Sequence, residues 1–560
     1  MSGQGEHHGL IPPLNRRQFL KGASLLGSGL AVSGWGLSPW IGNVFYRRGT
    51  YVYPDRPPTW PGVATRYSVC KQCGSDCGLA AHVYDGVLQK LDGNPYHPAA
   101  TEPQAPYATP VSSAAVWAAP HSLCPRGQAG RQTLYDPYRV IVPLKRTGPR
   151  GAGRWQTISW EQLIREVTAG GYLFSRVPGE GTRHVDGFGA LWQGGTGRLT
   201  PLDPAYPEYG PLTNGLAVYY GGAENGQTDF INRFAASFGT VNVEAADAIC
   251  DLNRMQATMQ SLDGMTDPLK PDVVNAEFIV WFGANVLEAH FPMQALGRKV
   301  AEATSSGRLK YWVVDVRGGN ALLHADRWIG VKPGGDGALA MGAIRWIIEH
   351  NAYDGSYLAA PNAKAAQAAG EPTFSNASWL VVADSAHPRF GQFLTTSDAG
   401  LGMVSADGGM GAATSGNVVL GPKQVPLGAD TAVRGTLWPQ GPLNTEPTMV
   451  NGVACRTALQ WLYLEARRFN LAEYAAAAGV SVSTIQDLAS EFTRHGKRAV
   501  ADYGRGPTMH TNGFDAGRAI MTLNLLIGNV DWAGGYVMGG GTADYTGTRA
   551  GAPYQLGSWP

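Results

Sequence analysis

Apolar and polar positions between residues 270 and 320 follow the order strand, helix, strand. Residues 277–282, apolar after Glu277, form a run that ends at Gly-Ala-Asn (283–285), and apolar residues then recur at helical spacing between Met293 and Ala303. A second apolar run occupies residues 311–315. This order predicts a right-handed βαβ unit in a parallel sheet, and therefore an α/β fold with Rossmann-like domains.

Polar residues follow the predicted strands where each one ends. Asn285 follows the first strand, Asp315 ends the second, and Arg317 comes two residues later. Ligands of open parallel sheets bind outside the carboxyl ends of the strands, where an acid suits ribose or base groups and an arginine suits phosphate. Asp336 stands near the start of a further predicted helix, where a plain N-cap is the alternative interpretation. The G-x-G-x-x-G fingerprint is missing from these segments, so we do not expect ordinary NAD binding.

Four of the six cysteines form a pattern that suits an iron–sulfur cluster. They stand as C-x2-C-x3-C, followed after 46 residues by a fourth: Cys70, Cys73, Cys77 and Cys124. Four thiolates are what a [4Fe–4S] cluster requires. A structural zinc site is the alternative, although such sites usually come as two C-x2-C pairs. The other two, Cys250 and Cys455, do not suggest a disulfide framework.

The N-terminal 50 residues resemble an export leader. Paired Arg16 and Arg17 precede an uncharged stretch from about residue 22 to 41, which is typical of a twin-arginine signal and predicts a periplasmic protein. A transmembrane anchor is the alternative. Its glycines and serines make this stretch a poor membrane-spanning helix.

Length and charge predict a large enzyme subunit of several domains. With 560 residues and a net charge of +1, the chain has no basic excess for nucleic acid. We expect a leader over 1–50, a cluster domain over 60–145, α/β domains over 155–540 and a short tail over 541–560. A glycine-rich insertion is expected within the α/β part, at 350–455.

An ordered set of motifs carries a resemblance to a known family. The chain resembles the molybdopterin oxidoreductases of the dimethyl sulfoxide reductase superfamily in the cluster cysteines and in segments 124–130, 281–285, 315–317, 332–339 and 504–529. The resemblance implies a bis(molybdopterin guanine dinucleotide) molybdenum cofactor beside the [4Fe–4S] cluster. It also implies a small C-terminal β-barrel domain beyond residues 534–535, which we do not expect within a chain that stops at Pro560.

The resemblance also implies roles for single residues. Cys250, which follows the Gly-x-x-Asn segment at 239–242, is the candidate molybdenum ligand, although a lone cysteine is more often a small buried hydrophobe. Arg126 corresponds to the cation between the cluster and the nearer pterin, with a surface arginine as the alternative. Around the guanine dinucleotides we expect Asn285, Asp315, Arg317 and Asp336.

Two further segments, 374–394 and 491–499, resemble the tetrathionate reductase branch of the superfamily. This resemblance implies reduction of tetrathionate to thiosulfate, with electrons from two partners, an iron–sulfur electron-transfer subunit plus a membrane quinol-oxidising subunit. Arsenate, polysulfide and thiosulfate reductases share the same motifs. A molybdenum-free electron-transfer subunit is the competing class.

Overall fold

The computed structural model describes most of the chain beyond residue 62. The described residues are 63–73, 76–97, 100, 123–221, 226–246, 250–262, 264, 269–290, 293–402, 416–430 and 432–538. The chain divides into two compact units, of which the second covers residues 64–107 and 119–560. Almost all of the first unit, the expected export leader and the expected tail at 541–560 lie outside the described residues. The description below therefore concerns the second unit.

A small three-stranded sheet begins the described chain. Its strands lie in the order β1 (Val63–Val69), β2 (Gly78–Tyr84) and β3 (Val87–Gly93). The β2–β3 hairpin closes through Asp85 and Gly86, both with positive φ, as a two-residue turn requires. Two short helices follow, α4 (Pro125–Gln128) and α5 (Gly130–Leu134).

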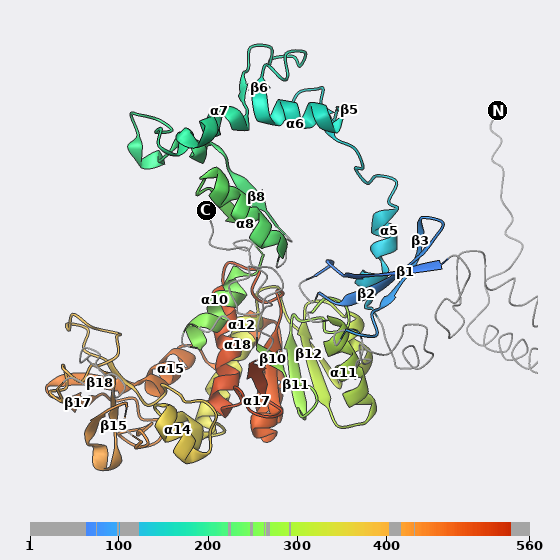
Figure 1. Ribbon diagram of the computed structural model, residues 1–560. Coiled ribbons are helices and arrows are strands. Elements are labelled where there is room, and N and C mark those ends of the chain that lie inside the picture. The colour runs from blue at the N-terminus through green and yellow to red at the C-terminus, as the bar shows by residue number, and fades with distance from the viewer. Residues whose placement is uncertain are drawn as a thin grey trace, which may run out of the picture. The chain divides into compact units, whose positions relative to one another are not determined.

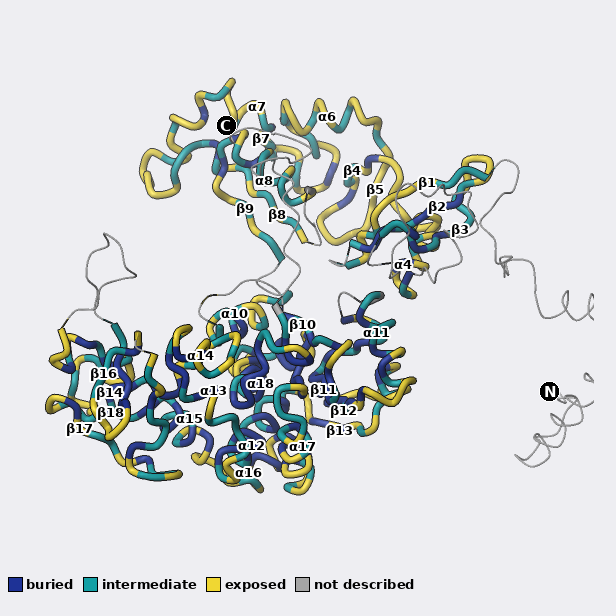
Figure 2. The backbone as a smooth tube through the Cα atoms, turned by 60° about the horizontal axis from the view of Figure 1, so that its bottom comes forward, coloured by how far each residue is buried: buried dark blue, intermediate teal, exposed yellow. Residues whose placement is uncertain are grey.

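The next segment consists of short elements with little burial. Its elements are β4 (Leu144–Arg146), β5 (Trp155–Thr157), α6 (Trp160–Ala169), β6 (Gly170–Gly171), β7 (Val185–Asp186), α7 (Phe188–Trp192), β8 (Val218–Tyr220), α8 (Gly226–Phe238) and β9 (Val243–Ala245). Ser159 caps α6 by accepting a hydrogen bond from the Gln162 amide. Most residues of β5, α6 and α7 are exposed (Figure 2).

A four-stranded parallel sheet lies at the centre of the largest body. Its strands lie in the order β13 (Arg327–Gly330), β12 (Lys310–Asp315), β11 (Phe278–Phe282) and β19 (Ala499–Tyr503) (Figure 1). Helix α11 (Met293–Ser305) connects β11 to β12. The predicted strand–helix–strand order and the parallel pairing are therefore confirmed. All five β11 side chains are buried, which explains the unbroken apolar run in the sequence.

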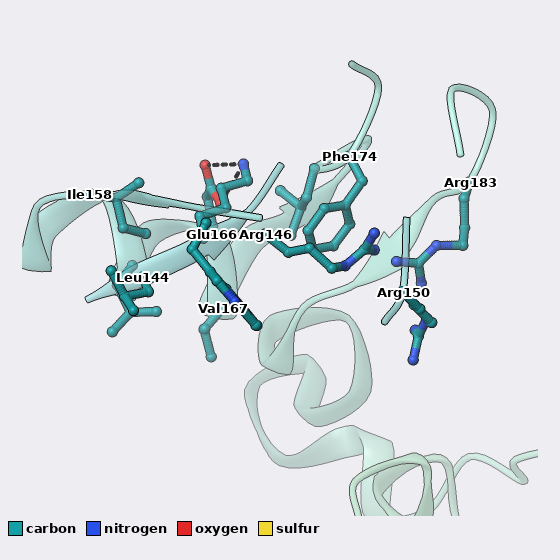
Figure 3. Close-up of a pocket in the computed structure, with 12 residues that line it drawn as sticks. Leu144, Arg146, Arg150, Ile158, Glu166, Val167, Phe174 and Arg183 are labelled. Carbon is teal, nitrogen blue, oxygen red and sulfur yellow. Dashed lines mark hydrogen bonds and ion pairs between the residues drawn. The ribbon is translucent and has the colours of Figure 1, made fainter. Parts of the chain in front are cut away.

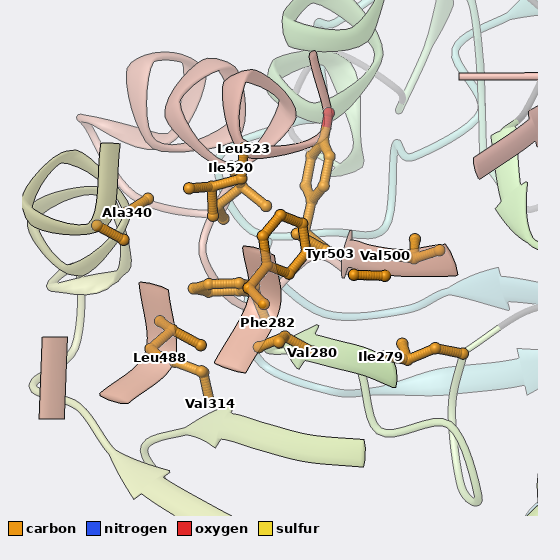
Figure 4. Close-up of a cluster of buried hydrophobic side chains, with 14 of the residues drawn as sticks. Ile279, Val280, Phe282, Val314, Ala340, Leu488, Val500, Tyr503, Ile520 and Leu523 are labelled. Atoms are coloured by element: carbon orange, nitrogen blue, oxygen red, sulfur yellow. The ribbon is translucent and has the colours of Figure 1, made fainter. Parts of the chain in front are cut away.

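Helices from the second half of the chain cover this sheet. They are α12 (Asp336–Glu349), α16 (Leu471–Ala478), α17 (Val482–Arg494) and α18 (Gly513–Ile527), and α10 (Leu252–Ser261) packs against α18. Figure 4 shows Phe282 and Val314 from the strands beside Leu488 of α17 and Ile520 of α18. Because these side chains are fully buried, truncating Phe282 to alanine is expected to cost about 3–5 kcal/mol.

The stretch expected as an insertion contains α13 (Gly355–Leu358), α14 (Ala363–Ala369), β14 (Leu380–Val382), β15 (Val418–Leu420), β16 (Pro426–Gly428), β17 (Thr448–Val450) and β18 (Val453–Thr457), and α15 (Ala458–Ala466) follows it. Residues between 380 and 455 form a small core of their own, whereas α13 and α15 contribute to the main core. Cys455 of β18 is fully buried in this core, in keeping with a structural cysteine.

A separate antiparallel pair joins β10 (Leu269–Pro271) to β20 (Tyr536–Met538). Among the described residues, the helices are too short or too polar to span a membrane.

Candidate functional site

The loops that follow β11 and β19 lie close together at glycine residues. Gly283 has a φ of 51°, and a Cβ placed on it would lie 2.4 Å from Cδ of Pro507. A Cβ on Gly506 would lie 2.7 Å from the Gly283 Cα. The carboxyl ends of these two neighbouring strands can approach this closely only because neither loop carries a side chain at these positions.

The residues predicted at the strand ends do come together. The Asn285 Nδ2 donates to Oε2 of Glu288 at 2.6 Å, and Nη2 of Arg317 donates to the same oxygen at 3.0 Å. The Arg317 amide in turn donates to Oδ1 of Asp315 at 2.9 Å. Glu288, which links the two loops, was missed by the sequence analysis because its role depends on this long-range meeting.

One atom at the strand ends lacks a partner. Oδ1 of Asn285 is buried and accepts no hydrogen bond from any described residue. A buried acceptor left in this way costs free energy unless a ligand supplies a donor. A Cβ on neighbouring Gly319 would lie 2.6 Å from Nδ2 of Asn285, so the backbone also approaches closely here. Both features suit a nucleotide seated against these loops.

Asp336 is the first residue of α12, and the N-cap position belongs to Gly335. The plain N-cap interpretation of Asp336 is therefore wrong. Its side chain is only 4% exposed. Burial, together with the charge of Asp315, raises the pKa of this carboxyl to about 6 against the opposing effect of a hydrogen bond from its own backbone amide. Asp336 thus belongs with Asp315 to one electrostatic group.

Cys250 lines a cavity of about 330 Å³ at the start of α10. The other lining residues are Asp251, Leu252, Asn253, Thr508, Met509, His510 and Thr511. The Asn253 Nδ2 donates to the Thr508 carbonyl at 2.9 Å and holds the two walls together. The sequence analysis identified Cys250 but missed the 508–511 wall, because about 250 residues separate the two segments.

The 508–512 loop also reaches the start of α12. The Asn512 Nδ2 donates to the Gly334 carbonyl at 3.0 Å, two residues before Asp336. The loop after β19 therefore touches both the Cys250 cavity and the turn that presents Asp336.

An ion pair stands beside Cys250. Arg254 donates to both carboxylate oxygens of Asp251, at 2.6 Å for the closest contact. Both side chains are largely buried. One turn further along α10, the Thr258 hydroxyl lies 2.7 Å from the Tyr503 hydroxyl of β19. These contacts fix the helix that carries Cys250 to the central sheet.

A second buried network surrounds Asp502, the neighbour of Tyr503 on β19. Asp502 accepts a hydrogen bond from the Tyr536 hydroxyl at 2.7 Å, and its other oxygen lies 2.7 Å from Nε2 of His290. Lys270 Nζ lies 3.3 Å from the same histidine nitrogen. Burial alone would raise the pKa of Asp502, but His290 and Lys270 hold it at about 2. Burial lowers the pKa of Lys270 to about 8.

The four candidate cluster cysteines are electrostatic neighbours. The Cys70 amide donates to the Cys77 carbonyl at 2.8 Å, and Cys124 occupies the N-cap of α4. Burial, together with the thiolate charges of Cys73, Cys70 and Cys124, raises the pKa of Cys77 to about 12. Such mutual repulsion favours a cationic group that binds all four. The described residues contain no group of three or more His, Cys, Asp and Glu placed to hold a single metal ion.

Arg126 lies in α4, two residues after Cys124, with an exposed side chain. Gly127 is buried against Leu123, where a Cβ would lie 3.2 Å from the leucine Cβ. The buried Gly127 thus lies next to an exposed Arg126 in the same short helix.

Two family models match most of this chain. Residues 63–136 match the molybdopterin oxidoreductase Fe4S4 domain, and residues 204–552 match the molybdopterin oxidoreductase family. The chain is 36% identical over 507 residues to a tetrathionate reductase subunit of Salmonella typhimurium, covering 88% of this chain and 47% of that protein. It is 33% identical over 588 residues to a selenate reductase subunit of Mesobacillus selenatarsenatis, covering 97% and 54%.

A third relative, a tetrathionate reductase subunit of Archaeoglobus fulgidus, is 29% identical over 590 residues, covering 93% of this chain and 49% of that protein. The chain thus spans about half the length of these relatives. The second family match includes the Cys250 cavity and the polar strand ends, and the first includes all four candidate cluster cysteines. This chain belongs to the molybdopterin oxidoreductase family.

Proposed function

We propose that this chain provides the cofactor-binding part of the catalytic subunit of a respiratory molybdenum reductase, with tetrathionate as its substrate. The observation that carries the proposal is the cavity at Cys250, because it combines a soft thiol with polar and apolar walls. The similarity to two tetrathionate reductase subunits supports the choice of substrate.

The residues fit the cofactor that the family implies. Cys250 would ligate molybdenum, and the guanine dinucleotides would contact Asn285, Asp315, Arg317 and Asp336. The unpaired Oδ1 of Asn285 suits a nucleotide N–H donor. Asp336, once ionised, can accept from the two adjacent N–H groups of a guanine edge. When bound, the bis(molybdopterin guanine dinucleotide) group supplies two-electron redox chemistry at molybdenum.

The second cofactor in the proposal is a [4Fe–4S] cluster. Cys70, Cys73, Cys77 and Cys124 would hold it, in keeping with the family match over this region. Arg126 would stabilise negative charge as an electron leaves the cluster. An exposed guanidinium suits this role, because it carries a positive charge and can turn toward the group it serves.

The cavity walls suit an elongated anion. Asn253, His510 and Thr511 line the cavity and carry groups that can donate hydrogen bonds to sulfonate oxygens. Leu252 and Met509, both substantially exposed, provide apolar contact for the central sulfur atoms. Tetrathionate would accept two electrons, break its central S–S bond and leave as two thiosulfate ions, without net uptake of protons.

The proposal includes partners and a location. Electrons would pass from a membrane quinol-oxidising subunit to an iron–sulfur electron-transfer subunit, which would deliver them to this chain in the periplasm after its export by the twin-arginine route. Each of the three relatives is named as one subunit of its reductase, which supports an assembly of several polypeptides.

Selenate is the second candidate substrate, because the selenate reductase match covers 97% of the chain. Selenate is a compact tetrahedral anion, and its reduction to selenite takes up two protons and releases water. The rate of that reaction should depend on proton supply, whereas cleavage of tetrathionate needs none. Arsenate, polysulfide and thiosulfate are further substrates to compare.

A matched pair of cysteine variants tests the proposal. Protein purified from its native host, with the polypeptides that copurify, is assayed with a reduced viologen and each candidate substrate. Cys250→Ala should abolish turnover and leave the EPR signal of the cluster intact, whereas Cys455→Ala, in the core of the insertion, should retain turnover. Full activity in Cys250→Ala would refute the assignment of the ligand. Activity with selenate alone would mean that selenate, rather than tetrathionate, is the substrate.

A further inference from the structure

Glu288 accepts hydrogen bonds from three sides at the carboxyl ends of β11 and β12. Its Oε2 accepts from Nδ2 of Asn285 at 2.6 Å and from Nη2 of Arg317 at 3.0 Å, and its Oε1 accepts from the Asn320 amide at 3.3 Å. Glu288 forms an ion pair with Arg317, and a carboxylate accepts hydrogen bonds but donates none. Each of its partners must therefore turn a donor toward it.

This requirement fixes the orientation of the Asn285 side-chain amide. An asparagine carries a donor and an acceptor on the same carbon, and a flip of the amide exchanges them. Because Nδ2 is turned toward Glu288, Oδ1 faces away from the carboxylate. This oxygen is buried and has no partner among the described residues. The reverse orientation would place two oxygens against each other at hydrogen-bond distance, which is repulsive.

A tight turn keeps Glu288 within reach of Asn285. The backbone amides of Glu288 and Ala289 donate to the Asn285 carbonyl at 3.0 and 2.9 Å, and that of His290 donates to it at 3.2 Å. The His290 ring in turn lies 2.7 Å from the buried carboxylate of Asp502. The far end of the turn is thus anchored to the central sheet, which holds the carboxylate and the amide together.

A similar contact elsewhere in the chain shows what is specific to Glu288. Glu166 lies beside a cavity of about 330 Å³ formed by the β4–β5 hairpin and α6 (Figure 3). It accepts from the Lys145 ammonium at 2.8 Å and from Nε2 of Gln162 at 2.9 Å. Gln162 has no buried oxygen without a partner, in contrast to Asn285. Glu166 therefore makes the same kind of contact without orienting an unpaired acceptor.

The orientation of Asn285 restricts what binds beside it. Its Oδ1 is satisfied only by a hydrogen-bond donor. A phosphate oxygen is an acceptor and carries negative charge, so both Oδ1 and Glu288 disfavour it here. The donors of a guanosine nucleotide are its ribose hydroxyls and the N–H groups of its base. The nucleoside therefore belongs beside Asn285, and the phosphates belong with the remaining N–H groups of Arg317.

We propose that Glu288 is a positioning residue of the nucleotide site, which fixes the Asn285 amide so that its oxygen accepts a hydrogen bond from the guanosine of the cofactor. Glu288 acts through Asn285 and need not touch the nucleotide itself. The inference rests on the proposed function for the presence of a guanine nucleotide. It adds which part of that nucleotide lies at the end of β11.

The first test needs no ligand. The full chain, produced in a host that makes no molybdopterin, is isotopically labelled in its asparagine side chains, and NMR identifies the Asn285 signal by its loss in Asn285→Asp. Glu288→Gln should move this signal upfield and speed its exchange with water, because the charge-assisted hydrogen bond of 2.6 Å is lost. Glu166→Gln, the matched control, removes the same kind of contact and should leave the signal unchanged.

The second test measures the affinity of the same protein for guanosine monophosphate and for analogues that each lack one ribose hydroxyl or one base N–H group. Loss of the donor that meets Asn285 should weaken binding by about tenfold or more, and the analogue that shows this loss tells ribose from base. In Glu288→Gln the preference for guanosine monophosphate over that analogue should shrink by about fivefold or more, because the amide is free to flip. Glu166→Gln should keep the preference.

A double variant separates positioning from a merely structural role. Asn285→Asp combined with Glu288→Gln leaves the net charge unchanged. The new carboxylate accepts from the new glutamine amide and still offers an oxygen to the nucleotide, so the preference should return.

Three results would count against these assignments. An Asn285 signal that does not respond to Glu288→Gln would overturn the positioning role, whatever the chain binds. A preference that survives in Glu288→Gln, or that fails to return in the double variant, would also overturn it. A chain that binds no guanosine monophosphate would refute the nucleotide site of the proposed function, and the NMR signal would still decide the role of Glu288.

Discussion

The buried carboxylate of Asp502 gives the sharpest prediction about stability. Asp502 is 1% exposed in β19 and lies 2.7 Å from both the His290 ring nitrogen and the Tyr536 hydroxyl. Asp502→Asn keeps the shape of the side chain but removes its charge. Lys270 then stays close to His290 without the charge of Asp502, the carboxylate that most favours its charged form.

Two estimates set the size of the effect. A pKa of about 2 for Asp502 against an ordinary 3.8 corresponds to about 2 kcal/mol of stability at neutral pH. Because the folded pKa is depressed, this contribution is present above pH 3.8 and is lost as the pH falls toward about 2. Removing one partner of a buried pair costs about 3–5 kcal/mol. We therefore expect Asp502→Asn to cost about 3 kcal/mol at pH 7.

Native-state hydrogen exchange of the β11 and β19 amides measures this cost without requiring the whole chain to unfold in one step. The matched control is Asp487→Asn, which breaks an exposed ion pair with Arg327 of 2.9 Å. That variant should change the free energy of opening by less than about 1 kcal/mol. Equal effects of the two substitutions at pH 7 would refute the reasoning.

Three further predictions concern the strand-end loops and two buried charges. Gly283→Ala should destabilise the protein by several kcal/mol, since the new Cβ meets Pro507; Gly307→Ala, also at positive φ but in open space, should cost only about 1–2 kcal/mol, and urea unfolding compares the two. The buried Lys270, with its pKa lowered to about 8, should make stability rise between pH 8 and 10.5, and this rise should vanish in Lys270→Met when the melting temperature is followed against pH. The raised pKa of Asp336, about 6, should make stability fall between pH 3.8 and 6, and an unchanged slope in Asp336→Asn would contradict that assignment.

The local part of the fold could be predicted from the sequence. The apolar run at β11 and the helical spacing of α11 are local patterns, so the strand, the helix and the parallel pairing followed from residues 277–315 alone. Asn285, Asp315 and Arg317 could be grouped because they lie at the ends of parallel strands, whose carboxyl ends must share one edge.

The remaining contacts of the site could not be predicted in this way. Asp502 meets His290 across 212 residues, and Cys250 meets Thr508 across a similar separation, because β19 pairs with β11 rather than with a sequence neighbour. One local signal was present: Asp502 is an acid within an otherwise apolar run, which indicates a buried partner somewhere in the chain. Its identity depends on the order of the strands, which periodicity does not reveal.

The metal content of the purified protein tests the central claim most directly. Protein isolated from its native host with its partners is analysed for iron and molybdenum, alongside the Cys250→Ala variant. The account predicts about four irons and about one molybdenum for each chain, with the iron retained in the variant. About four irons without molybdenum in the unaltered protein would contradict the reductase and would identify the chain as an electron-transfer subunit.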